Sequence, residues 1–258
     1  MPNVKFVHQF LEQAAITFSV GADPGYPVIN LQDRNPRHVA KSATNAINQR
    51  WIFQFPTALA VDTLMIDGHN FYSSNAGGTG ILLQSSPDGA AWTTKAMLAP
   101  AADLLPYEME IGQHSDLYWC LYFTKAAGNL AAIPQCGNIS IGARAEFGYP
   151  PDTQRTEDNE HNATVHARAM DSTPWRTENY GGIATWLLGW TNGSDPVVRT
   201  PFEVTWSSVD GDNQAFYFID QDGSIQLVLF QKGTNPKQTK AYLISDILNV
   251  GLEAFFSD

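Results

Sequence analysis

Asp67 and His69 lie two residues apart and carry side chains that could do acid–base or metal chemistry. On a β-strand such a pair points to one face, where a carboxylate and an imidazole can exchange a proton or share a metal ion. The alternative is a turn, because the segment Asp67-Gly68-His69-Asn70 also has the composition that ends a strand. We expect the turn.

Four aspartates in the second half, Asp210, Asp212, Asp220 and Asp222, have the Asp-x-Asp spacing that suits calcium. The EF-hand pattern, which needs a glutamate at loop position 12, is absent. Asp-Gly pairs are also common in the tight turns of β-hairpins. We therefore expect these aspartates to form turns.

Motifs of nucleophilic, phosphate-binding and zinc chemistry are missing from the sequence. There is no Gly-x-Ser-x-Gly, no phosphate-binding glycine-rich loop and no His-Glu-x-x-His. His161 and His166 are five residues apart among acidic neighbours, as is typical of a solvated linker. We therefore predict a protein that is not an enzyme.

Composition and charge narrow the range of partners. The chain has 258 residues, of which 43% are hydrophobic, enough for a sizeable core. No apolar run reaches the roughly 18 to 20 residues that span a bilayer, and the N-terminus does not resemble a secretory signal. A net charge of −11 without a Lys/Arg cluster repels phosphate. We expect neither nucleic acid nor a membrane as a partner.

The two cysteines lie in different contexts. Cys120 falls within the strand-like run 117–123, and Cys136 falls in a turn-rich stretch. We expect two buried free thiols; the alternative is a disulfide, which needs Cα atoms within about 7 Å of each other. Two cysteines in a chain of this length are typical of a protein that folds in a reducing compartment, or whose folding is indifferent to the redox state of the compartment.

Strand patterns dominate the first half of the chain. Trp51, Phe53 and Phe55 alternate along one run, as the buried face of a strand does. Pro56 marks a break before the next alternating run. Residues 5–15 could form a helical face or an irregular arm. The other strand-like runs are 59–65, 80–86, 92–94, 117–123 and 138–145.

A hairpin signal joins two of these runs. Pro87-Asp88-Gly89 follows residues 80–86, and proline and glycine supply the backbone angles of a tight turn. Because Trp51, Trp92 and Trp119 each fall in a strand-like run, we predict that all three are largely buried.

The second half is also rich in strands. Phe202, Val204 and Trp206 alternate, so we expect them to share one face of a strand. The stretch 146–162 combines Tyr149-Pro150-Pro151 with a charged run, which predicts a linker. The chain is therefore expected to be all-β, with domains at 1–148 and 149–258. The remaining strand-like runs are 185–190, 215–219, 224–230, 242–244 and 247–256.

Residues 27–142 resemble the discoidin-type, galactose-binding-like jelly roll. The resemblance follows the order of the segments 27–33, 51–55, 60–70 and 84–92, of which the hairpin Ser86-Pro87-Asp88-Gly89 leading to Trp92 is the most specific. It implies an N-terminal β-sandwich followed by a second β-rich domain.

The same resemblance implies two candidate sites. Asn30 and Asp33 stand where some galactose-binding-like modules bind a structural calcium; the alternative is that both cap their own loop. Phe71 and Tyr72 follow His69-Asn70 in a loop where such modules hold sugars on aromatic faces. The alternative is packing against the rim of the sheet. Apart from this calcium, no cofactor is expected.

The segments 31–36 and 68–70 also resemble those of bacteriophage tail-tip and minor tail proteins, and residues 199–258 resemble a β-rich domain of tail-tip hub and distal tail proteins. This resemblance implies a structural virion protein, assembled in the bacterial cytoplasm. Its partners would be other tail proteins and copies of itself in a ring.

Two segments are candidates for contacts in such a ring: the apolar arm 1–15 and the loop-rich stretch 149–182. Both could instead fold back on their own domains. The alternative function is a lectin-like module that recognises glycans on the host surface. The expected interface residues are Phe6, Phe10, Leu11, Trp175 and Tyr180.

Overall fold

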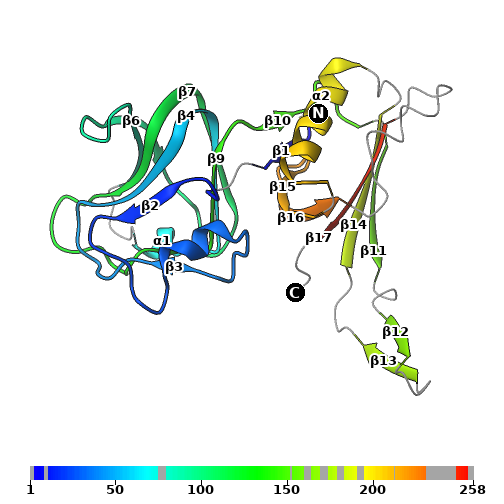
Figure 1. Cartoon of the computed structure of the whole chain (residues 1–258), viewed down its shortest axis with the longest axis horizontal. Helices are drawn as coiled ribbons and strands as arrows, with labels where there is room; N and C mark the ends of the chain where they lie inside the picture. The colour runs from blue at the N-terminus through cyan, green and yellow to red at the C-terminus, as the bar shows by residue number, and fades with distance from the viewer. Residues whose placement is uncertain are drawn as a thin grey trace. The chain divides into compact units, whose positions relative to one another are not determined.

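The computed structural model describes most of the chain (Figure 1). For the strand residues between 153 and 187, and at positions 248, 249, 251 and 253, only the backbone is described. The described residues are 3–8, 11–74, 80–151, 153–159, 164–168, 174–178, 183–190, 195–211, 213–230 and 248–254.

The chain folds into two compact units. Residues 9–144 form the first, here called the sandwich unit, and residues 1–8 join 145–258 in the second, here called the composite unit. This division differs from the expected domains 1–148 and 149–258. The N-terminal strand β1 (Lys5–Val7) pairs with β10 (Ala145–Glu146) on one side and β15 (Phe216–Ile219) on the other. The first residues are therefore part of the second unit.

The sandwich unit is an antiparallel β-sandwich, which confirms the predicted all-β jelly roll. Its main sheet has the strand order β2-β4-β7-β5-β6, and β9 also pairs with β4. A short pair, β3 with β8, one 3-10 turn, η1, and one short helix, α1, complete the unit. The bounds are β2 Ala15–Phe18, η1 Val28–Gln32, β3 Ala40–Lys41, β4 Gln49–Asp67, α1 Phe71–Ser74, β5 Ile81–Ser86, β6 Thr93–Leu98, β7 Tyr107–Phe123, β8 Gln135–Cys136 and β9 Asn138–Gly142.

The long strands β4 and β7 run side by side and curve over the sandwich (Figure 1). Their register shifts between Gln54 and Leu59 and again between Val61 and Thr63. The first part of β4 pairs with β2 and the last part with β9, so one strand serves both layers. The break expected at Pro56 is thus a bend within a continuous strand, because a bulge lets the strand turn a corner without ending.

The core of the sandwich unit follows the predicted alternation. Trp51, Phe53 and Phe55 are buried, and the ring of Trp51 stacks on Phe18 with 4.2 Å between ring centres. The Trp51 Nε1–H donates to Ser42 Oγ at 2.8 Å, which satisfies the buried indole. Trp119 is buried as predicted. Trp92 is only half-buried, so that part of the prediction is wrong.

The predicted hairpin turn joins β5 to β6. Gly89 has a φ of +77°, in the left-handed region that favours glycine. Asp88 Oδ1 accepts hydrogen bonds from the backbone N–H groups of Ala90 and Ala91 at 2.9 and 3.1 Å. These hydrogen bonds to the charged form lower the pKa of the Asp88 carboxyl. The Pro-Asp-Gly signal therefore predicted the turn correctly.

The composite unit is built on a seven-stranded antiparallel sheet with the order β10-β1-β15-β16-β17-β14-β11. A separate hairpin pairs β12 with β13. The interior contains clustered rings, with Phe6 at 4.9 Å from Phe147 and 5.0 Å from Phe216 between ring centres. The further bounds are β11 Thr153–Asn159, β12 Thr164–Arg168, β13 Pro174–Glu178, β14 Ile183–Trp190, β16 Ile225–Phe230 and β17 Leu248–Ala254.

The strand expected at Phe202, Val204 and Trp206 is wrong, because this segment is the helix α2 (Pro196–Ser208). Asp195 caps the helix by accepting from the Val197 N–H at 3.1 Å, and proline opens the first turn. In a helix, positions 202 and 206 share a face while position 204 points away. Phe202 is accordingly buried and Val204 exposed.

The linker expected over 146–162 also requires correction. Residues 153–159 form β11, which pairs with β14 from Thr153↔Gly189 to Asn159↔Ile183. The chain instead passes between the units at residues 8–9 and again at residues 144–145. A polar composition is compatible with a strand whose backbone bonds to a neighbour, which is why the charged run was misleading.

Both cysteines are free and buried, as expected. Burial raises the pKa of Cys120 to about 12, against the opposing positive charge of Arg50, and raises the pKa of Cys136 as well. Among the described residues, neither helix is long and apolar enough to cross a bilayer.

Candidate functional site

The two aromatics proposed to hold a sugar have opposite environments. Phe71 is fully buried, with its ring 5.7 Å from Trp51 and 5.3 Å from Phe123, so its assignment to a sugar site is corrected. Tyr72 is 56% exposed. The reason is helical geometry, since consecutive residues of α1 are rotated by about 100° about its axis. Tyr72 alone remains available to a ligand.

The turn that carries Tyr72 is held from one side by Asn70. The Asn70 Nδ2–H donates to Ile133 O at 2.8 Å, and Asn70 Oδ1 accepts from the Gln135 N–H at 2.9 Å. The same oxygen accepts from the Ser74 hydroxyl at 3.0 Å. This amide thus ties α1 to the loop before β8. The backbone beneath Tyr72 is fixed before any ligand arrives.

A second loop holds the turn from the other side. The Leu104 N–H donates to His69 O at 2.7 Å, and Asp103 Oδ1 accepts from the Ser73 N–H at 3.0 Å. Leu104 and Leu105 are 66% and 61% exposed. We call Tyr72, Leu104 and Leu105 with the carboxylate of Asp103 the Tyr72 platform. Neither leucine is among the site residues predicted from the sequence, although two adjacent apolar residues in a loop are a signal for exposed binding residues.

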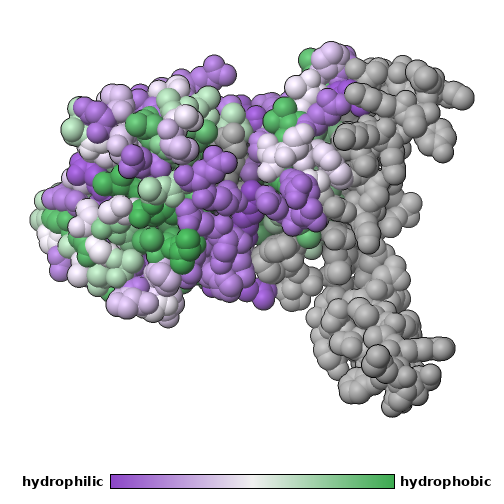
Figure 2. Space-filling view, viewed as in Figure 1, coloured by the Kyte–Doolittle hydropathy of each residue, from purple (hydrophilic) through white to green (hydrophobic). Residues whose placement is uncertain are grey.

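Exposed apolar residues elsewhere are scattered. Figure 2 shows hydrophobic residues in several groups among hydrophilic ones over the visible face of the sandwich unit. Single exposed apolar side chains are ordinary on protein surfaces. The feature that distinguishes the Tyr72 platform is therefore the hydrogen-bonded backbone that supports it, and not exposure alone.

Asp67 and His69 form the expected turn. Asp67 Oδ1 accepts from the Gly68 N–H at 2.7 Å, and His69 Nδ1 accepts from the Phe71 N–H at 3.1 Å. His69 is fully buried and stacks on Phe71 with ring centres 5.1 Å apart. Burial lowers the pKa of His69, although the charge of Asp103 opposes this shift. The imidazole is therefore neutral at neutral pH. It stabilises the turn by accepting the hydrogen bond from the Phe71 N–H.

Asn30 and Asp33 make contacts within their own loop. The Asn30 Nδ2–H donates to Val39 O at 2.8 Å, and Asp33 Oδ1 accepts from the Asn35 N–H at 2.9 Å. Asp33 Oδ2 lies 2.5 Å from His38 Nδ1. No group of three or more His, Cys, Asp or Glu side chains suited to a metal occurs among the described residues. The calcium site stays a prediction.

Two of the four aspartates in the second half of the chain, Asp220 and Asp222, form a turn, as expected. The Asp220 N–H donates to Ser224 O at 2.9 Å, and Asp222 Oδ1 accepts from the Ser224 N–H at 2.8 Å. These contacts form the hairpin turn between β15 and β16. Asp212 and His161 lie outside the described residues, and the side chain of His166 does too.

Two of the expected interface residues of the N-terminal arm are buried. Phe6 is fully buried in the core of the composite unit and Leu11 in the core of the sandwich unit, which corrects their assignment to an interface. Phe6 is buried because β1 is part of the sheet, and one face of that sheet is covered by the core of the unit. Phe10, Tyr180 and the side chain of Trp175 lie outside the described residues. Assembly into a virion stays a prediction.

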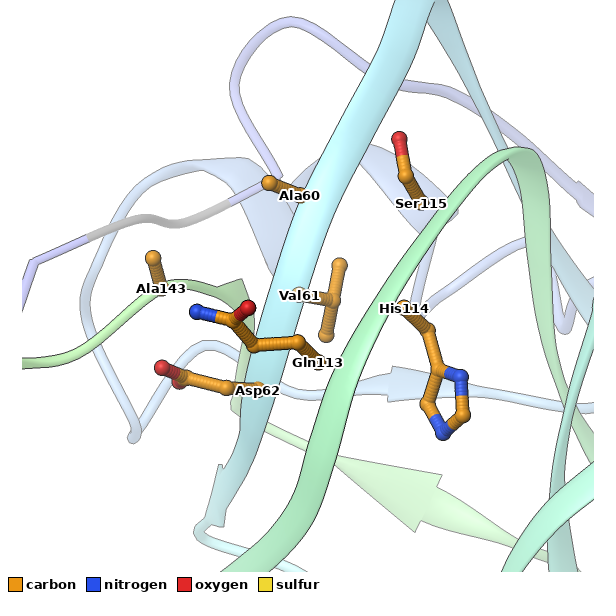
Figure 3. A pocket seen from close by; sticks show the side chains of 7 residues that line it. All are labelled: Ala60, Val61, Asp62, Gln113, His114, Ser115 and Ala143. Carbon is orange, nitrogen blue, oxygen red and sulfur yellow. The ribbon is translucent and has the colours of Figure 1, made fainter.

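One shallow cavity lies at the bend of β4 and β7 (Figure 3). Its volume is about 290 Å³, and buried Val61 lies among its lining residues. Asp62 accepts from the Arg144 N–H at 3.0 Å, and His114 Nε2 lies 3.1 Å from Ile111 O. Figure 3 shows that Asp62 and His114 do not point toward each other, so the cavity contains no acid–base pair formed by these two residues.

Comparisons with known proteins give structural similarity only. No known sequence family matches the chain, and no curated protein matches it. The module CBM32-1 from a family 31 glycoside hydrolase of Clostridium perfringens has a TM-score of 0.44 at 11% identity, covering 53% of this chain and 99% of the module.

Chitosan-binding module 1 of a chitosanase/glucanase from Paenibacillus sp. IK-5 has a TM-score of 0.43 at 12% identity, covering 53% of this chain and 100% of that module. A further module from Clostridium perfringens, CpGH89CBM32-5 in complex with GalNAc-β-1,3-galactose, has a TM-score of 0.41 at 12% identity, with 52% and 100% covered. At these values the similarity assigns no function to this chain.

Proposed function

We propose that the sandwich unit is a carbohydrate-binding module that holds a glycan on the Tyr72 platform. The observation that carries this proposal is an exposed aromatic ring on a turn held by hydrogen bonds from two loops. The C–H face of a pyranose packs on such a ring, and a rigid support lowers the entropy that binding must overcome.

The remaining groups of the platform suit the same kind of ligand. Leu104 and Leu105 are exposed apolar residues of the loop that is hydrogen-bonded to the Tyr72 turn, and a sugar face can cover such surface. Asp103 uses Oδ1 to hold the turn, and a carboxylate has a second oxygen that can accept from a sugar hydroxyl. Aromatic surface with few fixed polar groups is the usual composition of a small-ligand site.

A glycan array followed by isothermal titration calorimetry tests the proposal. Tyr72→Ala should weaken binding of the best neutral glycan at least tenfold. Tyr149→Ala is the matched control, because Tyr149 is an exposed tyrosine of the composite unit. Equal affinities of the wild type and the Tyr72 variant would place the glycan elsewhere, and no glycan binding at all would refute the proposal.

Binding on this platform is proposed to occur without turnover. The same glycans, incubated with the protein and analysed for new reducing ends, should be recovered unchanged. A reproducible rate of cleavage that Asp103→Asn removes would instead make the platform an active site.

A further inference from the structure

The outer face of the main sheet carries a second arrangement of aromatic and polar side chains. Since Trp51 and Phe53 point into the core, Arg50 and Ile52 must point outward from β4. The register places Arg50 opposite Tyr122 and Ile52 opposite Cys120. The outward-facing residues on the neighbouring strands are Tyr118, Cys120 and Tyr122 of β7, Leu82, Gln84 and Ser86 of β5, and Thr94 and Met97 of β6.

Arg50 lies close to two aromatic rings on this face. Its guanidinium carbon is 4.2 Å from the ring centre of Tyr122 and 5.9 Å from that of Trp92. Trp92 precedes β6, at the end of the sheet opposite to Arg50, so the two side chains approach each other across the face. Gln84 and Cys120 are nearly or fully buried although they point outward, which fits a face partly covered by these side chains.

The ring of Tyr122 is fixed in place. Its hydroxyl donates to Asn48 Oδ1 at 2.8 Å, and the same oxygen accepts from the Thr124 hydroxyl at 3.2 Å. Asn48 itself has a φ of +60°, which directs the chain into this contact. A ring held from its polar end supports the guanidinium of Arg50 on its flat surface, so the cation is ordered before a ligand binds.

The charge of Arg50 has no acidic partner on this face. None of the ion pairs among the described residues includes Arg50, and the outward-facing residues named above contain no aspartate or glutamate. The Arg50 Nε is buried and has no hydrogen-bond partner among those residues. Lys95, in contrast to Arg50, has an acidic partner, because Asp116 Oδ2 lies 3.9 Å from its Nζ.

We infer that this face binds an acidic oligosaccharide, with the carboxylate of a uronic-acid residue on Arg50 and a sugar ring on Trp92. A guanidinium binds a carboxylate through two parallel hydrogen bonds, and its planar shape stacks on aromatic rings at the same time. A uronic acid joins the two required features in one unit, since the carboxylate is attached to a pyranose ring. Exposed Met97 extends the apolar surface.

The small number of cations on this face argues for a short oligosaccharide, and not a polyanion, as the occupant. Residues 9–144 contain 7 basic and 10 acidic side chains, a net charge of −3. A nucleic acid needs several cations to neutralise its phosphates, whereas this face offers one. This second site differs from the Tyr72 platform in its residues and in the charge of its ligand, so either site can fail without the other.

Calorimetric titration of the full chain tests the inference with three probes: trigalacturonate, trimannuronate and a glucuronic-acid trisaccharide. At least one should bind, and its fully methyl-esterified form, which keeps the rings and loses the charge, should bind at least tenfold more weakly. Binding of none of the three, or equal binding of acid and ester, would overturn the inference.

Variants locate the site. Arg50→Gln should weaken binding of the acid at least tenfold, and Arg50→Lys should weaken it less, because lysine keeps the charge and loses the planar fork. Tyr72→Ala should leave the affinity for the acid unchanged, which separates this site from the proposed function. Thermal melting checks that each variant is folded; a folded Arg50→Gln that binds as the wild type does would contradict the inference.

Salt gives a second measurement that does not depend on the variants. Raising NaCl from 50 to 500 mM should weaken binding of the acid severalfold, since the ion pair is partly exposed and is screened. Binding of a neutral glycan at the Tyr72 platform should change little over the same range. An affinity for the acid that salt does not change would argue against the Arg50–carboxylate pair.

Discussion

Phe71 and Tyr72 are adjacent in the chain and lie in opposite environments on the same helical turn. Phe71 is fully buried against Trp51 and Phe123, whereas Tyr72 is 56% exposed. The buried ring anchors the turn in the core and the exposed ring faces solvent. Stability and binding are therefore assigned to neighbouring residues, and mutation can separate them.

Replacing Phe71 with alanine should lower the free energy of unfolding by roughly 3 to 5 kcal/mol, because a cavity replaces a buried ring. Tyr72→Ala should lower it by no more than about 0.5 kcal/mol, as is usual at exposed positions. Urea denaturation followed by tryptophan fluorescence measures both. Similar losses for the two variants would show that Tyr72 packs in the core.

The two tryptophans of the predicted core should also differ. Trp51→Ala should cost roughly 3 to 5 kcal/mol, since its indole stacks on Phe18 and donates to Ser42 within the core. Trp92→Ala should cost clearly less, because Trp92 is half-buried on the outer face. Melting temperatures by differential scanning calorimetry rank the variants, and the opposite order would contradict the assignment of the core.

The sequence predicted the features that depend on local pattern. The alternation of Trp51, Phe53 and Phe55 identified the buried face of β4, and Pro87-Asp88-Gly89 identified the turn after β5. The helix α2 was missed because aromatic residues at 202 and 206 fit a strand face as well as a helical one. The cap Asp195 followed by Pro196 was the signal that could have decided between them.

Other features depend on contacts between residues far apart in the chain. β1 pairs Lys5 with Ile219, and no short-range pattern announces a partner more than 200 residues away. Arg50 meets Tyr122 through the register of two strands, which bulges in β4 help to set. The sequence pointed to Phe71 and Tyr72 as candidates for a sugar site. Only the folded structure of α1 shows that Tyr72 is the exposed one.

The N-terminal strand provides a test of the two units. Phe6→Ala should destabilise the composite unit, because Phe6 lies within 5.0 Å of the ring centres of both Phe147 and Phe216. The sandwich unit should be unaffected, and a fragment of residues 9–144 should remain folded. Limited proteolysis of the variant with mass spectrometry identifies the resistant part. Loss of both units together would show that they unfold as one.

The two thiols should be unreactive in the folded protein. Burial raises the pKa of Cys120 to about 12 and raises that of Cys136 too, so both remain protonated at pH 8. A thiol-specific disulfide reagent should therefore modify neither cysteine in the native state, and both in denaturant. Rapid modification of either thiol in native protein would contradict their burial.

The same shift makes stability depend on pH at the alkaline end. The thiol has a pKa of 9.0 when unperturbed and about 12 at Cys120 in the folded chain. Between these values the folded state binds more protons than the unfolded state, so the stability that this thiol contributes is complete below pH 9 and falls as pH rises toward 12. At pH 10.5 the loss from Cys120 should be about 2 kcal/mol.

Cys120→Ala isolates this contribution, because tyrosines and lysines also titrate above pH 9. The difference in unfolding free energy between wild type and variant, measured in urea at pH 7.5 and 10.5, should shrink at the higher pH by about 2 kcal/mol. Arg50 is unchanged in both proteins, so its opposing effect on the thiol is part of the comparison. A difference that stays constant across the two pH values would mean that Cys120 ionises at its ordinary pKa and is open to solvent.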